Sequence, residues 1–243
     1  MHLIADAILL SVRAHGEHGA VARALTRVDG VQPGYVRGGH ARQLRPVLQP
    51  GNAVRGEWRA RTDEQLAALT VELVQSRAGL HGLALSAAAL DWVTALTATT
   101  LPEAQPYPQL YDALGAVLDA VEAAPSARGW AAALARYELL VLAELGFGLD
   151  LSACIATGTT DDLAFVSPKS GAAVCRGAAA GYEARLFALP PFLRDGGAAT
   201  GAEVIEALAI TGHFLARDLL IDRRRDPLAA RERLLERLHR AVA

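Results

Sequence analysis

The spacing of apolar residues changes once along this chain of 243 residues, near residue 80. Before that point the apolar runs are short and are separated by turn residues, a pattern typical of strands. After it, apolar residues recur at helical spacing over most of the remaining length. The change predicts an α+β protein, with a sheet-forming domain at residues 1–80 and a mainly helical domain at residues 81–243.

The N-terminal domain contains four clear strand-like runs, at residues 7–12, 21–28, 31–37 and 54–61. Asp29-Gly30 separates the second run from the third and is a strong hairpin signal. In the fourth run, apolar residues and glycine alternate with charged residues, which predicts one buried face and one exposed face.

Residues 62–75 fit two different structures. Leu66, Leu69 and Leu73 have near-helical spacing. Several short strands in so small a domain also fit a closed barrel, in which no edge strand is left open, and such a barrel needs a fifth strand. We predict a strand at residues 68–74 on the ground of closure alone.

The C-terminal domain is predicted to contain helices at residues 86–99, 108–124, 128–145 and 201–221, and a last helix that begins at Asp226-Pro227. Ser86 is the expected N-cap of the first of these helices. The third has an apolar stripe made of Trp130, Leu134, Tyr137, Val141 and Leu145. Residues 149–191 are rich in Gly, Thr, Asp and Pro, which predicts an irregular insert.

Charge is distributed unevenly, although the net charge is only −2. Residues 23–61 contain eight arginines against two acids, Asp29 and Glu57. Residues 62–127 contain eight acids against one arginine, Arg77. A basic front and an acidic middle predict two parts with different roles.

Six of the front arginines are candidates for binding nucleic acid. Three lie in a flexible, glycine-containing loop: Arg37, Arg42 and Arg45. The other three share one face of a strand, where like charges repel unless an anion is bound: Arg55, Arg59 and Arg61. The alternative is a solvated barrel face without a ligand. Tyr35 and Trp58 are the candidates for base stacking, and we expect Trp58 to face the core.

Motifs for catalysis are missing from the sequence. It contains no phosphate-binding glycine loop, no nucleophile elbow and no zinc-protease motif. For His15 with His18, and for Asp161-Asp162, solvated turns are favoured over a metal site or a catalytic pair. We therefore predict that the chain is not an enzyme.

Cys154 and Cys175 lie within the irregular insert. A structural zinc site requires a Cys-x2-Cys pair at each end, and the partner positions here are Thr157 and Ala178. The residues allow a zinc loop, but two thiolates do not complete a tetrahedral site. A degenerate zinc-finger-like loop without metal is favoured, and we expect no cofactor.

The sequence shows neither a signal peptide nor an apolar stretch long enough to span a bilayer. We therefore expect a cytoplasmic protein with no membrane partner.

A set of short segments carries a family resemblance along nearly the whole chain. In order, they are Ala7-Ile-Leu-Leu-Ser-Val-Arg-Ala-His-Gly-Glu17, Gly34-Tyr-Val-Arg-Gly-Gly39, Leu44-Arg-Pro-Val-Leu-Gln-Pro-Gly51, Arg136-Tyr-Glu-Leu-Leu140, Glu144-Leu-Gly-Phe-Gly-Leu-Asp150 followed by Cys154, Phe165-Val-Ser-Pro168 and Thr211-Gly-His-Phe-Leu215. Together these segments resemble the RecO family of DNA-repair proteins.

The resemblance implies an N-terminal OB-fold barrel and a helical C-terminal domain. It also implies a recombination mediator that binds single- and double-stranded DNA, anneals complementary strands and helps to load recombinase onto strands coated with single-strand-binding protein. The implied location is the cytoplasm, at the nucleoid during repair. Some family members have a four-cysteine zinc site, of which Cys154 and Cys175 match the first and third positions.

Two protein partners follow from the same resemblance. One is RecR. The other is the acidic C-terminal tail of single-strand-binding protein, which a basic residue and apolar neighbours would bind on the helical domain. Arg136 matches the basic position, and Tyr137 and Leu140 lie beside it.

Three hypotheses of function follow. The first is a mediator that anneals strands without consuming nucleotide. The second is an adaptor for RecR and single-strand-binding protein that has little intrinsic DNA binding. The third, a zinc-dependent or thiol enzyme built on Cys154 and Cys175, is the weakest because the other zinc ligands are missing.

Overall fold

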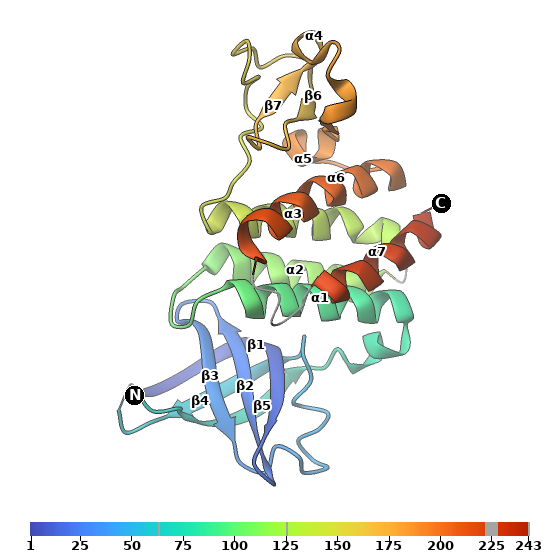
Figure 1. Ribbon diagram of the computed structural model, residues 1–243. Helices are drawn as coiled ribbons and strands as arrows, with labels where there is room; N and C mark the ends of the chain where they lie inside the picture. Colours follow the sequence, from blue (N-terminus) through green and yellow to red (C-terminus); the bar gives the residue numbers. More distant parts are fainter. Residues whose placement is uncertain (63, 125, 222–227, 243) are drawn as a thin grey trace. The chain divides into compact units, whose positions relative to one another are not determined.

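The computed structural model describes residues 1–62, 64–124, 126–221 and 228–242 (Figure 1). The chain divides into two compact units. Unit 1 contains Met1–Pro125 and Ala229–Leu234, and unit 2 contains Ser126–Leu228 and Leu235–Ala243. The predicted domain boundary after residue 80 lies near the point where the strands of unit 1 end and its helices begin, and it stays a prediction.

Five strands of unit 1 form a closed barrel (Figure 1). They are β1 (His2–His15), β2 (Gly19–Thr26), β3 (Gly30–Val36), β4 (Ala53–Arg59) and β5 (Ala68–Gln75). The order around the barrel is β1-β2-β3-β5-β4, so β1 pairs with both β2 and β4. Only the β3–β5 pairing is parallel, with Tyr35 opposite Ala68. The predicted OB-like barrel is confirmed.

Alternate side chains of each strand point into the barrel and fill its interior. Leu9, Val54, Trp58 and Leu69 are each at most 4% exposed and belong to one core cluster. Small residues on β2, Ala22 and Ala24, complete this core beside the large Trp58 ring. The expectation that Trp58 faces the core is confirmed.

Two local predictions about the barrel are also confirmed. Asp29-Gly30 lies at the β2–β3 turn, where Gly30 has a φ of +69°, a conformation that glycine adopts without strain. The ambiguous segment is a strand, β5, as closure requires. The three leucines do not share one buried face, as they would on an amphipathic helix, because Leu69 is buried while Leu66 and Leu73 are exposed.

Unit 1 also contains helices α1 (Ala84–Thr100) and α2 (Pro108–Ala123), which lie beside one end of the barrel (Figure 1). Both helices were predicted, but the N-cap expected at Ser86 is wrong. Leu83 occupies the cap position, and Ser86 is a buried residue inside α1. The helix starts earlier because Ala84 and Leu85 are good helix formers and nothing stops the helix before them.

Unit 2 is built on α3 (Ala131–Glu144) and α6 (Gly201–Phe214). A short 3-10 turn, Ala127–Gly129, precedes α3, and a π-helical turn, Leu215–Leu219, follows α6. The predicted apolar stripe of α3 is buried from Trp130 to Val141. Thr200 caps α6 in a capping box with Glu203, a signal in the sequence that our prediction did not use.

The insert predicted to be irregular contains more structure than expected. Within it, β6 (Leu163–Val166), β7 (Ala173–Cys175) and β8 (Phe187–Ala188) form a small sheet in the order β7-β6-β8. The short helix α4 (Arg176–Ala179) and the 3-10 turn Glu183–Arg185 complete the insert, and the short helix α5 (Pro191–Asp195) begins at its last residue. Strands of two to four residues are too short to show a period in the sequence.

The last helix, α7 (Leu228–Val242), contributes residues to both units. Its predicted start at Asp226-Pro227 lies outside the described residues. In the part of the chain that the structure describes, no helix is both long enough and apolar enough to cross a membrane.

Candidate nucleic-acid interface

The β3–β4 connection presents three of the predicted arginines. Arg37, Arg42 and Arg45 are all exposed there. No acidic residue occurs in the sequence between Asp29 and Glu57, so this connection has no negative charge of its own. Among the described residues, neither Arg37 nor Arg42 forms an ion pair, and the guanidinium of Arg45 donates only to the carbonyl of His40, at 3.3 Å. The loop is therefore a cationic surface ready for an anion.

This loop is more ordered than the flexible connection that we predicted. Successive turns are closed by backbone hydrogen bonds, such as that from Leu48 N to Leu44 O at 2.8 Å. Leu48 is 5% exposed and packs in the barrel core, and Leu44 packs against it. The side-chain amide of Asn52 donates to the carbonyls of Pro46 and Val47 at 2.8 and 3.0 Å. The loop arginines therefore project from an anchored frame.

The strand-borne arginines have acidic neighbours that the linear sequence conceals. Arg55 forms an ion pair with Asp6 of β1 at 2.9 Å, and the register also places Glu72 of β5 opposite it. Arg59 lies 2.6 Å from Glu57 on the same strand. Both arginines are exposed, but each already has a counter-ion.

Glu57 shows the effect of this pairing on titration. Hydrogen bonds from His2 and then from Arg59 lower the pKa of the Glu57 carboxyl below its ordinary value. Arg61 lies just beyond β4 and is exposed, with no ion pair among the described residues. This surface is consequently less cationic than the loop.

A different group of barrel arginines faces the helices of unit 1. Arg23 donates to the carbonyl of Ala98 on α1 at 2.6 Å and lies 3.2 Å from Glu103. Arg27 makes a two-point contact with Asp112 of α2, at 2.9 Å for each of two nitrogen–oxygen pairs. The hydrogen bond from Arg27 lowers the pKa of the Asp112 carboxyl. These arginines hold the acidic middle of the sequence to the barrel.

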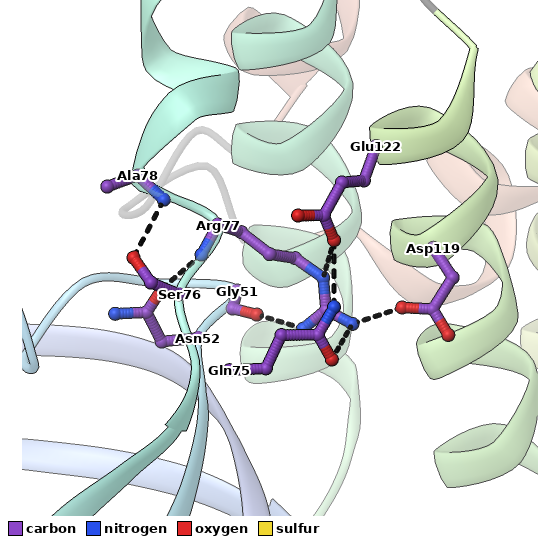
Figure 2. Close-up of polar contacts among 8 residues, drawn as sticks. All are labelled: Gly51, Asn52, Gln75, Ser76, Arg77, Ala78, Asp119 and Glu122. Atoms are coloured by element: carbon purple, nitrogen blue, oxygen red, sulfur yellow. Dashed lines mark hydrogen bonds and ion pairs between the residues drawn. The ribbon is translucent and has the colours of Figure 1, made fainter.

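Arg77 is the most buried of this group, at 3% exposure. Figure 2 shows its contacts with Gly51, Gln75, Asp119 and Glu122. Its guanidinium donates to the Gly51 carbonyl at 2.7 Å and forms ion pairs with Asp119 and Glu122 of α2. Its backbone N–H donates to the side-chain oxygen of Asn52 at 2.8 Å. Asn52 thus joins the arginine loop on one side to the barrel–helix connection on the other.

Two residues outside our predicted set lie at the end of β1. The register extends β1 to His15, so Arg13 and His15 are strand residues on its exposed side. The His15 ring meets the Tyr35 ring edge to face, with centroids 5.9 Å apart. Our predicted strand ended at residue 12. If the strand pattern had been continued past residue 12, the alternation of inward and outward side chains would have placed Arg13 and His15 on the exposed face.

The predicted partner-binding residues on α3 differ in exposure. Arg136 is half-buried, donates to the Gly197 carbonyl at 2.6 Å and lies over the Phe192 ring at 5.1 Å. Leu140 is half-buried as well. Tyr137 is 1% exposed, so its ring is part of the core of unit 2. Arg136 and Leu140 are the two of the three that a partner could touch directly.

The cysteine loop brings together the four positions at which a zinc finger holds its ligands. Cys154 and Cys175 are buried free thiols, and the Cys175 N–H donates to the Cys154 sulfur at 3.2 Å. The Thr157 hydroxyl lies 3.6 Å from the Cys175 sulfur, and Ala178 packs against the same cluster. Among the described residues, no group of three or more His, Cys, Asp or Glu side chains could hold a metal ion. A hydroxyl and a methyl group do not replace two thiolates, so these residues do not fit zinc.

Neighbouring hydrogen-bond donors change the titration of Cys154. The N–H of Cys175, and next the Thr157 hydroxyl, lower the pKa of the Cys154 thiol to about 6. Hydrogen bonds therefore stabilise the thiolate in this chain.

Comparison with known proteins places both halves of the chain in one family. The family model for the N-terminal part of recombination protein O matches residues 1–77, and the model for its C-terminal part matches residues 84–227. A protein from Cereibacter sphaeroides strain KD131 named DNA repair protein RecO is 47% identical, over 97% of this chain and 98% of the relative. Relatives of the same name from Rhodospirillum centenum and Xanthobacter autotrophicus are 46% and 44% identical. These two alignments cover 97% and 98% of this chain, and 94% and 97% of the respective relatives.

Proposed function

The chain belongs to the recombination protein O family of DNA-repair proteins, and from that premise we propose that it is a recombination mediator. In this proposal it binds single- and double-stranded DNA, anneals complementary strands and helps to load recombinase onto strands coated with single-strand-binding protein. It acts as a binding protein, without catalytic turnover, metal or cofactor, in the cytoplasm at the nucleoid.

The observation that supports this function best is the acid-free loop with Arg37, Arg42 and Arg45. Exposed guanidinium groups that lack counter-ions gain the most from phosphate, because no internal ion pair must be broken first. Cations that contact two strands lower the repulsion between the strands and raise the local concentration of complementary partners. Annealing by this route needs no nucleotide.

Arg55, Arg59 and Arg61 have a secondary role in the proposal. Phosphate must compete with Asp6 for Arg55 and with Glu57 for Arg59. We assign the main phosphate contacts to the loop and place these three at the edge of the bound strand.

The proposed protein partners are RecR and the acidic tail of single-strand-binding protein. For the tail, Arg136 supplies the cation and Leu140 the apolar contact, while Tyr137 supports α3 from the core. The Arg136 guanidinium already lies against carbonyl groups and the Phe192 ring, which fixes its orientation before a carboxylate arrives.

One observation favours the adaptor as a second candidate. Five arginines of unit 1 already form ion pairs with acids: Arg23, Arg27, Arg55, Arg59 and Arg77. The net charge of the whole chain is −2. An adaptor would use the barrel as a solvated surface and would act through RecR and single-strand-binding protein alone.

An annealing assay separates the two candidates. Two complementary fluorescently labelled strands, each coated with single-strand-binding protein, are mixed without nucleotide or added metal, and energy transfer is followed with time. We expect the protein to accelerate annealing, and we expect the combined Arg37→Ala, Arg42→Ala and Arg45→Ala substitutions to abolish most of the acceleration.

A charge-matched control locates the effect. Arg128→Ala, Lys169→Ala and Arg185→Ala remove the same charge from exposed positions of unit 2 and should leave annealing intact. If the wild-type protein binds the tail but does not accelerate annealing, the mediator is refuted and the adaptor stands. If both triple variants lose the activity equally, the assignment to the loop is wrong.

A further inference from the structure

The outer surface of the barrel has one row of residues with a mixed chemical character. The register places Arg13 of β1 opposite Val21 of β2, Val21 opposite Tyr35 of β3, and Tyr35 opposite Ala68 of β5. Side chains two strands apart in such a row are roughly 10 Å from each other. Tyr35 is therefore a half-buried aromatic residue on the outer surface of the barrel, with an arginine in the same row.

A shallow groove opens over this row. Its volume is about 430 Å³, and it is lined by His15, Gly16, Glu17, Tyr35, Leu66 and Ala68. A groove of this size is within the range of small-ligand sites, which runs from about 300 to 1,000 Å³. Its wall comes from the β1–β2 turn on one side and from the β4–β5 connection on the other. Leu66 is an exposed apolar side chain, at 46% exposure.

Tyr35 is held in place from two directions. The His15 and Tyr35 rings meet edge to face, at an interplanar angle of 79°. A Cβ atom on Gly19 would collide with the Tyr35 ring, so glycine at this position lets the ring lie against β2. The ring is thus oriented before any ligand binds, which lowers the entropy cost of stacking on it.

We propose that the groove formed by Tyr35, His15 and Leu66 binds one unstacked nucleobase of single-stranded DNA. The inference rests on the proposed function, and it assigns to the barrel a base-binding platform in addition to its phosphate-binding loop. Aromatic rings stack on any base, and the apolar Leu66 side chain can cover the other side of the base.

The charges around the groove fit a strand on either side of the bound base. Arg37 follows Tyr35 by two residues and is the first residue after β3, which ends at Val36. Arg13 and Arg37 are both exposed, and neither forms an ion pair among the residues that the structure describes. Glu17 is the one acid in the lining, and its side chain is 94% exposed, so it stays in water when a base occupies the groove.

This platform predicts a preference for single strands. A base in a duplex is paired and stacked, and it must be extruded before it can reach Tyr35, which costs free energy. Duplex DNA can still bind the loop arginines through its phosphates. The two kinds of contact therefore separate in an experiment that removes the bases but keeps the phosphates.

The test compares an oligothymidylate with an abasic strand that has the same number of phosphates, by fluorescence anisotropy. The wild-type protein should bind the oligothymidylate more tightly than the abasic strand. Tyr35→Ala should weaken binding of the oligothymidylate by about tenfold, the effect of losing one base–aromatic contact, and should leave the abasic strand and the salt dependence unchanged. Tyr35→Phe keeps the ring and should keep the wild-type affinity.

Tyr182→Ala is the matched control, since it removes a tyrosine that is 59% exposed in unit 2. It should change neither affinity. Thermal unfolding of each variant checks the fold, and Tyr35→Leu provides a second variant that keeps apolar bulk without an aromatic face. It should weaken oligothymidylate binding as well.

Each failure has a distinct meaning. If the wild-type protein binds both strands equally, or if Tyr35→Ala and Tyr35→Leu bind the oligothymidylate as tightly as wild type, the platform is refuted while DNA binding by the loop stands. If the wild-type protein binds neither strand, the proposed function fails, and the platform fails with it.

Discussion

Two groups of arginine on the same barrel differ in what lies across from them. Arg23, Arg27 and Arg77 face α1 and α2 and meet backbone carbonyls or carboxylates there. Arg37, Arg42 and Arg45 lie on a loop that has no acidic residue. The first group is used within the fold, and the second is the group to which we assign the phosphate contacts. On this proposal, the counter-ions of an arginine decide whether it has a structural role or a binding role.

The first group should matter most for stability, and Arg77 is its extreme case. Arg77→Ala removes a buried guanidinium and leaves the Gly51 carbonyl and two carboxylates without their partner. We expect the free energy of unfolding to fall by about 2–4 kcal/mol. Urea unfolding followed by tryptophan fluorescence measures it.

Arg176→Ala is the control for that measurement. Arg176 pairs with Asp162 at 3.4 Å, with both side chains more than half exposed, so its loss should cost at most about 0.5 kcal/mol. Equal effects of the two substitutions would mean that burial does not distinguish the two groups.

The second group should matter most for DNA affinity. Replacing Arg37, Arg42 and Arg45 by alanine removes three phosphate contacts, and each contributes about 0.7 to the slope of log affinity against log salt for single strands. We expect the slope to fall by about 2 while the urea midpoint stays unchanged. An unchanged slope in a salt titration would show that the loop does not contact phosphate.

Arg55 and Arg59 are exposed like the second group but have counter-ions like the first. Removing a counter-ion should therefore convert one of them from the first kind to the second. Asp6→Asn removes the carboxylate that lies 2.9 Å from Arg55. Arg55 then becomes available to phosphate, so the salt slope should rise, by at most about 0.7. Ser11→Ala, which leaves all charges in place on the same strand, should have no effect. A lower affinity in Asp6→Asn would contradict this account of the pairing.

The smallest effect is expected at the exposed pair of Arg27 and Asp112. Arg27→Ala should lower stability slightly at neutral pH and should leave DNA affinity unchanged. Because Arg27 lowers the pKa of Asp112, the stabilisation is fully present above the ordinary pKa of an aspartate and is lost as the pH falls through the lowered pKa.

Unfolding of wild type and Arg27→Ala at neutral and at strongly acidic pH measures this dependence. The difference between the two proteins should shrink in acid as Asp112 becomes protonated. A difference that grows in acid would show that another group produces it.

Much of the fold follows from local patterns in the sequence. Alternation in residues 54–61 predicts a strand with Trp58 inside, and Asp29-Gly30 predicts the β2–β3 turn, because both depend only on neighbouring residues. The apolar stripe of α3 is predicted for the same reason. The fifth strand needed closure of the barrel as an additional condition, since the spacing of its leucines also fits a helix.

The candidate site also has one part that follows from local sequence and another part that depends on the tertiary structure. The sequence by itself determined that Arg37, Arg42 and Arg45 would be exposed in an acid-free segment, because that property depends on contiguous residues. Only the tertiary structure decided which other arginines are neutralised, since Asp6, Asp112 and Asp119 lie 49, 85 and 42 residues from their partners. It alone also joined His15, Tyr35 and Leu66 into one groove, because strand pairing and barrel closure place side by side residues that are far apart along the chain.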